Sequence, residues 1–460
     1  MDIAVIGAGY VGLTTAACLA EIGHQVSCAE GDPQKLALLK GGGAPFFEPQ
    51  LESLMRRNRE TGRLSFCTTP EAIGSSRAIF ICVGTPPLEN GEADLAAIEN
   101  VARSIAQQAV GYRLVIEKST VPVQTGRQLQ KHLARYSSSA FSYDVASNPE
   151  FLREGSAVGD FFHPDRIVVG SESAKATEIL QEIYQPILTQ QFVCPVHDSC
   201  PPSPSTPFLV TDINSAEIVK HASNSFLAMK ISFINLIADL CEAAGADVTQ
   251  VARGIGLDQR IGRTFLRPGI GFGGFCFPKD LQAFVRIAEK LGVDFSLLRE
   301  VEKINQRRIE QFVERVRAEL WVLRDKKICC WGLAFKPNTD DIRFAPSLAI
   351  IRRLLAEGAE ISAYDPQATE KAKATLPAVR YCDDPYEAVK GAEALLVLTE
   401  WDEFETADLE RVRSLMERPL IIDGRNVFPP EKVASCGLQY VSLGRPATSP
   451  ETVTKAVVSD

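Results

Sequence analysis

The sequence predicts an α/β protein with two doubly wound domains, each built on a parallel sheet, joined by a long central helix. Three observations indicate this architecture. Residues 2–30 read as a buried strand, a glycine-rich turn, a helix and a second strand, and a similar alternation begins again at Lys327. Between them, residues 213–244 form one helical pattern far longer than an average helix. Alternating strands and helices are typical of parallel sheets covered by helices on both faces.

Length and composition place the chain among ordinary soluble proteins. Its 460 residues suggest roughly three domains. A hydrophobic content of 45% with 23% charged residues is typical of globular chains. The net charge of -9 argues against a nucleic-acid-binding protein. The chain has no run of about 18 apolar residues and no basic opening segment, so we expect neither a membrane span nor a signal peptide.

The cysteines and histidines indicate a reducing compartment and no metal. The 12 cysteines are scattered without paired spacing, and the adjacent Cys329 and Cys330 suit a buried strand better than a disulfide. We therefore expect a cytoplasmic location. The five histidines show no ligand spacing with each other or with cysteines. This absence of spacing predicts that the chain holds no metal.

The first strand and helix carry a dinucleotide-binding pattern. Residues 2–6 read as a short buried strand, followed at once by Gly7-Ala8-Gly9-Tyr10-Val11-Gly12 and a helical segment. The first glycine makes the tight turn, the second admits a pyrophosphate, and the third lets the helix pack on the strand. Glu30, at the end of the next strand, would accept hydrogen bonds from ribose hydroxyls and repel a 2′-phosphate. The pattern predicts a Rossmann-like domain that prefers NAD to NADP.

Three further strands of this domain are followed by polar residues. They cover residues 78–83, 113–117 and 143–146. Because the carboxyl ends of parallel strands face the ligand crevice, Thr85, Thr120 and Glu150 should point toward cofactor and substrate; for the threonines the alternative is capping of helices or turns. Glu150 and Glu154 would share a face if their segment is helical. Two acids there suggest charge stabilisation or water activation, and the alternative is a solvated helix start.

The middle of the chain combines an exposed loop with the long helix. Residues 197–208 are rich in proline and serine, as in a loop or linker. The helix over 213–244 is apolar around much of its circumference, which suits a spine between domains or a dimer interface. Lys220 and Asn224 lie four residues apart on one face of it, where an ammonium and an amide could stabilise an oxyanion. The alternative for Lys220 is a side chain that snorkels to solvent.

A glycine-rich segment with one cysteine, residues 268–280, is the candidate reactive loop. Its sequence is PGIGFGGFCFPKD. Pro278 could begin a helix, which would put Cys276 just before a helix N-terminus, where the dipole favours a thiolate. Asp280 would then lie in the first turn. The alternative is that Cys276 is a buried small hydrophobe, but the surrounding glycines favour a functional role.

The C-terminal third predicts a second strand–helix–strand domain without the glycine fingerprint. Strands are expected at residues 327–332, 394–398 and 420–423, a helix at 347–358, and a strand ending in Asp365. A second NAD is therefore not expected. A nucleotide phosphate could instead be met by Lys336, Arg343 or Arg425. The expected division is residues 1–196 for NAD binding, 209–310 for a central helical part with dimerisation and active-site roles, 320–445 for a second nucleotide-binding domain, and 446–460 for a tail.

Several motifs in order resemble the UDP-glucose 6-dehydrogenases of the UDP-glucose/GDP-mannose dehydrogenase family. They are GAGYVG (7–12), VGTP (83–86), KSTVP (118–122), NPEFLREG (148–155), the Lys220/Asn224 helix, FGGFCFPKD (272–280) and GLAFKPNTDDIR (332–343). The resemblance covers about residues 1–445. It implies a four-electron oxidation of UDP-glucose to UDP-glucuronate with two NAD⁺ and water, and a homodimer or higher oligomer.

The resemblance also assigns roles to residues. It implies that Cys276 captures the sugar aldehyde as a thiohemiacetal that becomes a thioester. The implied catalytic set is Cys276, Lys220, Asp280, Asn224, Thr120 and Glu150. The implied NAD contacts are Gly7, Gly9, Tyr10, Val11, Gly12, Glu30, Lys35, Thr85, Thr120, Glu154, Lys279 and Arg343. The implied substrate contacts are Glu150, Phe151, Leu152, Arg153, Glu154, Lys220, Asn224, Arg260, Phe265, Leu266, Arg267, Pro268, Gly269, Gly273 and Lys336, with Arg260 reaching the neighbouring subunit.

The chain departs from the family pattern at a few positions. Glu30 stands where aspartate is common, Gln124 replaces a glycine, and Phe275 replaces the usual serine before the cysteine. Three alternative functions remain open at this point. They are the same chemistry on GDP-mannose or a UDP-N-acetylhexosamine, a single-step alcohol dehydrogenase, and a silent nucleotide-sugar sensor.

Overall fold

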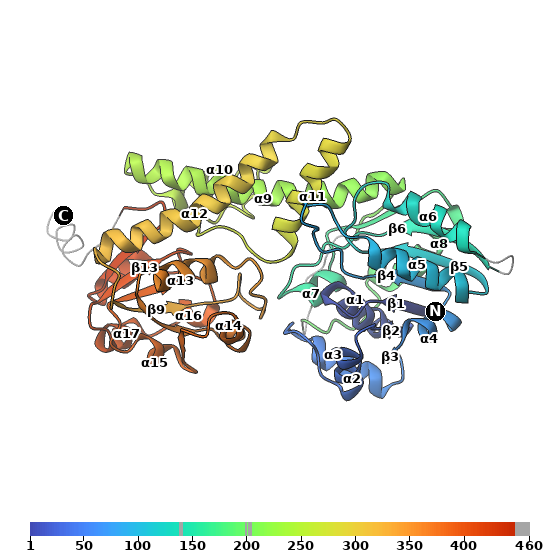
Figure 1. Cartoon of the computed structure of the whole chain (residues 1–460), viewed down its shortest axis with the longest axis horizontal. Helices are drawn as coiled ribbons and strands as arrows, with labels where there is room; N and C mark the ends of the chain where they lie inside the picture. Colours follow the sequence, from blue (N-terminus) through green and yellow to red (C-terminus); the bar gives the residue numbers. More distant parts are fainter. Residues whose placement is uncertain (138–140, 198–199, 201–204, 447–460) are drawn as a thin grey trace. The chain divides into compact units, whose positions relative to one another are not determined.

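The computed structural model describes residues 1–137, 141–197, 200 and 205–446, and it forms two compact units (Figure 1). The first unit comprises Met1–Ser223 and Gln282–Val293, and the second comprises Asn224–Leu281 and the chain from Asp294 onward. Each unit contains one sheet, and the long helix α9 (Ile213–Ala244) contributes to both. The expected tail, apart from Pro446, lies outside the described residues.

The first unit is built on an eight-stranded sheet in the order β3-β2-β1-β4-β5-β6-β7-β8. All neighbours are parallel except β6 and β7, which pair antiparallel. The strands are β1 (Asp2–Ile6), β2 (Gln25–Ala29), β3 (Leu64–Cys67), β4 (Ala78–Ile81), β5 (Gly111–Glu117), β6 (Phe141–Ser147), β7 (Ile167–Ser171) and β8 (Phe208–Thr211).

Helices cover both faces of this sheet, as side-chain alternation in β1 requires. Ile3 and Val5 pack with α1, α3, α7 and α8, whereas Ala4 and Ile6 pack on the opposite face with α4, α5 and α6. The helices are α1 (Tyr10–Glu21), α2 (Pro33–Gly41), α3 (Leu51–Glu60), α4 (Thr69–Ser75), α5 (Ala96–Gln108), α6 (Thr125–Tyr136), α7 (Ala157–Phe162) and α8 (Ala174–Leu188). The sheet is therefore doubly wound, as predicted.

The second unit contains a six-stranded parallel sheet in the order β11-β10-β9-β12-β13-β14, the doubly wound order typical of dinucleotide-binding folds. Its strands are β9 (Lys327–Trp331), β10 (Glu360–Tyr364), β11 (Arg380–Tyr381), β12 (Ala394–Val397), β13 (Leu420–Asp423) and β14 (Gln439–Ser442). Its helices are α13 (Pro346–Ala356), α14 (Thr369–Thr375), α15 (Pro385–Val389), α16 (Asp402–Glu405), α17 (Leu409–Leu415) and α18 (Pro430–Ser435). One continuous apolar core surrounds this sheet.

Of the helices that the sequence predicts, one is confirmed by the structure and two are corrected. The helix predicted over 213–244 is α9, followed by α10 (Val248–Gly256), α11 (Cys276–Lys290) and α12 (Ser296–Leu320). Helix α11 begins at Cys276 itself, so the expectation that Cys276 precedes a helix starting at Pro278 is wrong by one half-turn. Residues 148–155 are not helical, so Glu150 and Glu154 do not share a helix face.

Among the described residues, no helix is long and apolar enough to cross a bilayer.

Candidate functional site

The turn between β1 and α1 uses its three glycines for three different reasons. Gly7 has φ +102°, a left-handed conformation that side chains disfavour, and a Cβ there would lie 2.8 Å from the Cys82 carbonyl oxygen. A Cβ on Gly12 would lie 1.8 Å from the Gly7 carbonyl oxygen, so helix and turn touch there. A Cβ on Gly9 meets nothing within 4 Å. Because the fold has no need of a glycine at that position, open space at Gly9 suits the close approach of a ligand.

The first turn of α1 offers its N-terminus to this open space. Gly9 is the N-cap residue, and no side chain caps the helix. The positive end of the helix dipole and its first N–H groups therefore suit an anionic ligand. Val11 is partly buried and packs on the apolar core beneath the turn.

Glu30 and Lys35 form an ion pair at the end of β2. Lys35 Nζ lies 2.9 Å from Glu30 Oε2, and Glu30 Oε1 accepts hydrogen bonds from the backbone N–H groups of Gly31 (2.8 Å) and Asp32 (3.0 Å). Burial alone would raise the pKa of Glu30, but the hydrogen bonds from Lys35, Asp32 and Gly31 outweigh it and lower that pKa. The carboxylate at the strand end is thus held ionised, the state that accepts hydrogen bonds.

Tyr10 belongs to a buried network centred on Glu48, a residue that the sequence reasoning missed. The Tyr10 hydroxyl donates to Glu48, whose two oxygens accept from the N–H groups of Gly155 (2.6 Å) and Ala157 (2.7 Å). Glu48 therefore anchors the end of the segment 148–155 to the start of α1. Nothing in the local sequence around Glu48 indicates this role, because Tyr10 lies 38 residues away and Gly155 and Ala157 lie more than a hundred residues away.

The segment 148–155 presents a buried ion pair between Glu150 and Lys220. Glu150 Oε1 lies 2.9 Å from Lys220 Nζ, and both side chains are about 5% exposed. The other Glu150 oxygen accepts from the Leu152 N–H (2.5 Å). The expected alternative for Lys220, a side chain that snorkels to solvent, is therefore wrong. A buried lysine persists because the carboxylate compensates its desolvation.

A second buried lysine lies in the same unit, at the end of β5. Lys118 Nζ donates to the Asn148 side-chain oxygen (3.1 Å) and to the Tyr184 hydroxyl (3.4 Å). Burial lowers the pKa of Lys118 to about 8, opposed by the charges of Cys82 and Glu150. The sequence places Lys118 in the KSTVP motif, from which no role for this lysine was predicted.

The remaining expected residues of this unit have defined contacts. The Thr85 hydroxyl donates to the Thr120 carbonyl (2.8 Å), so the two threonines meet as expected from the strand ends. The Arg166 guanidinium lies over the Phe151 ring, with its Cζ 3.9 Å from the centre of the ring. Arg153 pairs with Asp160 at 2.5 Å and is largely exposed, whereas Glu154 is buried.

In the second unit, Cys276 is the partly buried first residue of α11. Asp280, one turn later, is 1% exposed. Its Oδ2 accepts from Asn224 Nδ2 (2.6 Å), and its Oδ1 lies 2.7 Å from Lys279 Nζ. The structure thus brings Asn224 of α9 to Lys279 and Asp280, which lie in the helical turn that carries the cysteine. A thiol at a helix N-terminus favours the thiolate, the nucleophilic form.

The glycines before Cys276 are required by packing within the chain. Gly271 and Gly274 have φ +101° and +78°, and a Cβ on Gly273 would lie 2.4 Å from the Phe344 carbonyl oxygen. The expectation that these glycines indicate ligand approach therefore has a simpler explanation here. They let the loop pass against residues 335 and 344–346, which fixes the position of the cysteine.

Side chains from distant elements hold the same loop, and the sequence reasoning missed them. Asn305 of α12 donates to the Phe272 carbonyl (2.9 Å) and accepts from its N–H (2.8 Å). Asn235 of α9 accepts from the Gly269 N–H (2.8 Å), and Arg308 Nε donates to the Gly269 carbonyl (3.2 Å). Asparagines within helices are a weak sequence signal, since their partners are visible only in three dimensions.

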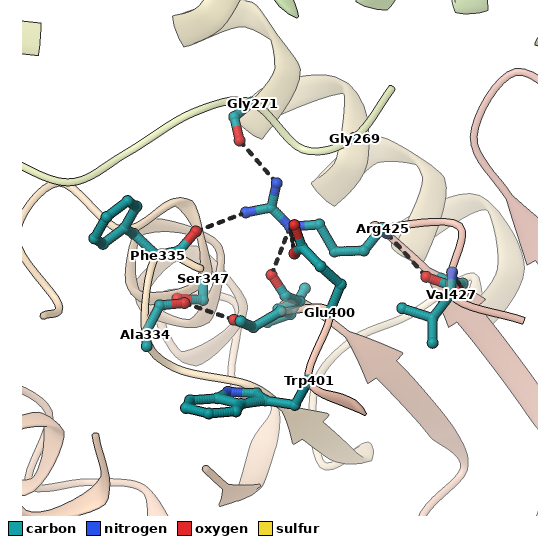
Figure 2. Close-up of polar contacts among 12 residues, drawn as sticks. Gly269, Gly271, Ala334, Phe335, Ser347, Glu400, Trp401, Arg425 and Val427 are labelled. Atoms are coloured by element: carbon teal, nitrogen blue, oxygen red, sulfur yellow. Dashed lines mark hydrogen bonds and ion pairs between the residues drawn. The ribbon is translucent and has the colours of Figure 1, made fainter. Parts of the chain in front are cut away.

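Arg425 joins this loop to the second sheet. Figure 2 shows its side chain between Gly271 and Phe335: the guanidinium donates to their carbonyl oxygens at 3.0 and 3.3 Å. Arg425 Nε also donates to the Leu398 carbonyl (2.9 Å) and lies 3.3 Å from Glu400 Oε2. All three guanidinium nitrogens are engaged with the chain, so Arg425 acts as a clamp on the loop. The expectation that Arg425 is a counter-charge for phosphate stays a prediction.

Phe275, which departs from the family pattern, lies between two cations. Lys279 Nζ lies 5.7 Å and Arg343 Cζ 4.5 Å from the centre of its ring, distances that allow cation–π attraction. Arg343 is also paired with Asp341 at 2.6 Å. Lys336, partly buried, lies over the Phe335 ring at 5.4 Å.

The segment 260–269 is mixed in exposure. Arg260 is 89% exposed in its side chain and pairs with Asp258 at 2.6 Å. Phe265 has φ +64° and its ring lies 6.3 Å from that of Phe277. Leu266, Pro268 and Gly269 are buried, whereas Arg267 is exposed.

Comparison with known proteins finds similarity along most of the chain. Residues 1–188 match the UDP-glucose/GDP-mannose dehydrogenase family, NAD binding domain; residues 214–307 match its central domain; and residues 329–430 match its UDP binding domain. The chain is 45% identical over 447 residues to UDP-glucose 6-dehydrogenase TuaD of Bacillus subtilis (strain 168), covering 97% of this chain and 93% of that protein.

Two solved structures are similar in fold. A UDP-glucose dehydrogenase from the hyperthermophilic archaeon Pyrobaculum islandicum is 37% identical with a TM-score of 0.86, covering 96% of this chain and 98% of that one. A UDP-D-ManNAc dehydrogenase from Pyrococcus horikoshii is 27% identical with a TM-score of 0.81, covering 97% and 99%.

Proposed function

The chain belongs to the UDP-glucose/GDP-mannose dehydrogenase family, and from this membership we propose that it oxidises UDP-glucose to UDP-glucuronate with NAD⁺ as hydride acceptor. The observation that carries the proposal is 45% identity over nearly the full length to a UDP-glucose 6-dehydrogenase. The cysteine at the start of α11, with Asp280 one turn later, supplies the chemistry that a four-electron oxidation needs. A single-step alcohol dehydrogenase has no use for such a thiol.

The turn between β1 and α1 fits NAD. Open space at Gly9 and an uncapped helix N-terminus suit the pyrophosphate, and the ionised Glu30 suits the ribose hydroxyls. We propose that Gly7, Gly9, Tyr10, Val11, Gly12, Glu30, Lys35, Thr85, Thr120, Glu154, Lys279 and Arg343 contact the cofactor. When bound, NAD⁺ supplies the hydride acceptor for both oxidation steps.

Cys276 is proposed as the covalent nucleophile. Oxidation of the C6 alcohol releases a hydride and a proton and leaves an aldehyde. The Cys276 thiolate adds to the aldehyde carbon and gives a thiohemiacetal after protonation of its oxygen. Loss of a second hydride and of the hydroxyl proton gives a thioester. Water then attacks the thioester carbonyl, and the C–S bond breaks to return the thiolate and release the carboxylate.

The buried polar residues are proposed to handle protons and charge in these steps. Lys220 and Asn224 would stabilise negative charge on the C6 oxygen, which an ammonium and an amide N–H can do by donating hydrogen bonds. Asp280, already paired with Asn224 and Lys279, would take up protons. Thr120 and Glu154 would position water or the nicotinamide, and Glu150 would stabilise charge or activate the water that hydrolyses the thioester.

The substrate is proposed to contact residues from several segments. They are Glu150, Phe151, Leu152, Arg153, Glu154, Lys220, Asn224, Arg260, Phe265, Leu266, Arg267, Pro268, Gly269, Gly273 and Lys336. We propose a homodimer in which Arg260 reaches the neighbouring subunit, supported by its 89% exposed side chain. A cytoplasmic location is proposed as well, supported by twelve free cysteine thiols.

The test is the yield of NADH per sugar nucleotide. Purified protein is mixed with excess NAD⁺ and limiting UDP-glucose, GDP-mannose or UDP-N-acetylglucosamine, and absorbance is followed to completion. Two NADH per UDP-glucose, with little from the others, is the expected result. One NADH per UDP-glucose would remove Cys276 from the mechanism, and two from another sugar nucleotide would replace the substrate. Cys276→Ala should abolish acid formation and keep NADH binding, while Cys436→Ala, another partly buried thiol, should change neither.

A further inference from the structure

Four side chains that are typical metal ligands meet at one place in the first unit, and none of them is among the residues assigned above. They are His163, Cys194, His197 and Cys200, and one ligand atom from each lies within 4.8 Å of all the others. His163, Cys194 and Cys200 are partly buried, and His197 is exposed. Nothing in the proposed reaction uses them, yet two thiols and two imidazoles converge on a common centre.

The distances between these atoms match tetrahedral coordination. His163 Nε2 lies 3.2 Å from Cys194 Sγ and 3.4 Å from Cys200 Sγ. His197 Nδ1 lies 3.6 Å from Cys194 Sγ and 3.9 Å from Cys200 Sγ. Zinc bonds of about 2.0–2.1 Å to nitrogen and about 2.3 Å to sulfur, at tetrahedral angles, separate nitrogen from sulfur by about 3.6 Å. The four nitrogen–sulfur distances bracket this value.

Local structure directs the ligands inward from two sequence-distant segments. His163 follows directly after α7, and its N–H donates to the Gly159 carbonyl (2.9 Å). Cys194, His197 and Cys200 follow α8 with the spacing Cys-x₂-His-x₂-Cys. The N–H groups of Val196 and His197 both lie 3.4 Å from Cys194 Sγ and donate to it. Such donation favours a thiolate, the form in which cysteine binds metal.

We propose that His163, Cys194, His197 and Cys200 bind one Zn²⁺ ion as a structural site. Two thiolates with two imidazoles are a ligand set that zinc prefers, and the two thiolate charges balance the ion. Four protein ligands leave no open position for substrate, so the site is closed and structural rather than catalytic. The expectation that the chain holds no metal rested on absent ligand spacing, an argument that overlooked the run from Cys194 to Cys200 and its partner His163.

The consequence for the fold is a cross-link between α7 and the connection from α8 to β8. In that connection Phe192 and Val196 pack against the apolar core of the first unit, whereas Val193 is 85% exposed. A zinc ion would hold the connection against the end of α7, which directly follows the segment 148–155. Metal binding to a site that exists only in the folded chain adds its free energy to folding.

The experiment uses the full chain, produced with zinc in the medium and dialysed against metal-free buffer. Metal content is measured for the wild type, Cys194→Ser, Cys200→Ser and the control Cys67→Ser, a partly buried free thiol of the same unit. The wild type and Cys67→Ser should hold about one zinc per chain, and the two ligand variants at least about tenfold less. A chelator should lower the Tm of the wild type and leave that of Cys194→Ser unchanged. Equal zinc in wild type and ligand variants would overturn the proposal.

A second measurement keeps the proposal testable if the ligand variants do not fold. Zinc-free wild type is titrated with Co²⁺, and its absorption spectrum is followed. Intense ligand-field bands of tetrahedral cobalt, with thiolate-to-cobalt charge transfer, should saturate at one equivalent and disappear on addition of Zn²⁺. A spectrum like that of aqueous cobalt would overturn the proposal, as would a Cys194–Cys200 disulfide found by peptide mapping of protein purified without oxidant.

Discussion

At the scale of single residues, the buried charged side chains of the first unit are the features that most clearly indicate a reactive centre. Lys220 is compensated by Glu150, and Lys118 lies nearby in the same unit with a pKa lowered to about 8. Burying charged groups lowers the free energy of unfolding unless each charge is compensated, and removing one partner leaves the other unpaired. Their burial is therefore the strongest residue-level support for a reactive centre on this part of the chain.

Lys220→Ala should lower kcat with UDP-glucose by about 10²-fold or more if the ammonium stabilises an oxyanion. The same change leaves the Glu150 carboxylate buried without its cation, so the variant should also unfold at lower temperature. Steady-state kinetics on folded protein separates the two effects. Lys230→Ala, on the same helix but donating to the Ile261 carbonyl, is the control and should retain kcat. A change below about twofold in Lys220→Ala would remove the catalytic role.

A second pair of buried acids predicts how stability depends on pH. Glu117 lies beside Glu217, and burial first, then the charge of Glu217, raise the pKa of Glu117 well above its ordinary value. Burial also raises the pKa of Glu217, although it accepts hydrogen bonds from the N–H groups of Gln124 (2.6 Å) and Gly126 (2.8 Å). A carboxyl with a raised folded pKa stabilises the protein below its unfolded pKa, and this contribution is lost as pH rises through the folded pKa.

The free energy of unfolding of the wild type should therefore fall as the pH rises above the ordinary glutamate pKa of 4.5, over a range that extends to the raised pKa values of this pair. Glu117→Gln removes one titrating group and should flatten that dependence and raise stability at the upper end of the range. Urea unfolding at several pH values measures the free energy of unfolding and its dependence on pH. Glu178→Gln, an exposed acid on α8, should leave the slope unchanged. An unaltered slope in Glu117→Gln would mean that other groups carry the pH dependence.

At the scale of elements, the sequence predicted the strands and helices that have a clear local pattern of apolar residues and glycines. The β1–turn–α1 pattern, the strands β5, β9 and β13 and the bounds of α9 follow from apolar periodicity and glycine spacing, and all were found. What remained hidden depends on partners distant in sequence. No periodic pattern in the sequence indicates the short edge strand β11 or the antiparallel pairing of β7. The same holds for the hydrogen bonds of Glu48 and Asn305 and for the proximity of His163 to Cys194.

The glycine turn of β1 and α1 separates folding from ligand binding in one pair of variants. A Cβ at Gly12 would overlap the Gly7 carbonyl at 1.8 Å, so Gly12→Ala should destabilise the first unit strongly. A Cβ at Gly9 meets nothing within 4 Å, so Gly9→Ala should keep the wild-type Tm and weaken NADH binding by obstructing the pyrophosphate. Thermal unfolding and NADH fluorescence titration test both. Normal NADH affinity in Gly9→Ala would contradict the assigned position of the cofactor.

The loop that carries Cys276 should depend on Arg425. Removing its guanidinium leaves the carbonyl groups of Gly271, Phe335 and Leu398 without this hydrogen-bond donor. Each buried carbonyl left without a partner lowers the free energy of unfolding by about 1–3 kcal/mol. Arg425→Met should displace the loop and reduce kcat/KM for UDP-glucose by up to about 10²-fold, because small misplacements of a nucleophile slow reaction strongly. NADH affinity should stay unchanged, and the exposed Arg411→Met should behave as wild type. A raised KM with normal kcat would instead favour a direct phosphate contact.

At the scale of the whole molecule, two units with separate cores predict that the two ligands stabilise different parts of the chain. Residues 1–188 match an NAD binding domain and residues 329–430 a UDP binding domain. A ligand that binds only the folded state stabilises the part it contacts by mass action. Hydrogen exchange read by mass spectrometry should therefore show NADH slowing exchange in peptides around Gly9 and Glu30, with little effect on β10 to β13. UDP should slow exchange around Lys336 and leave the glycine turn unaffected, and uridine, which lacks phosphates, should do neither at the same concentration. Protection of the glycine turn by UDP would contradict the assignment of that turn to the dinucleotide and of the UDP moiety to the residues around Lys336.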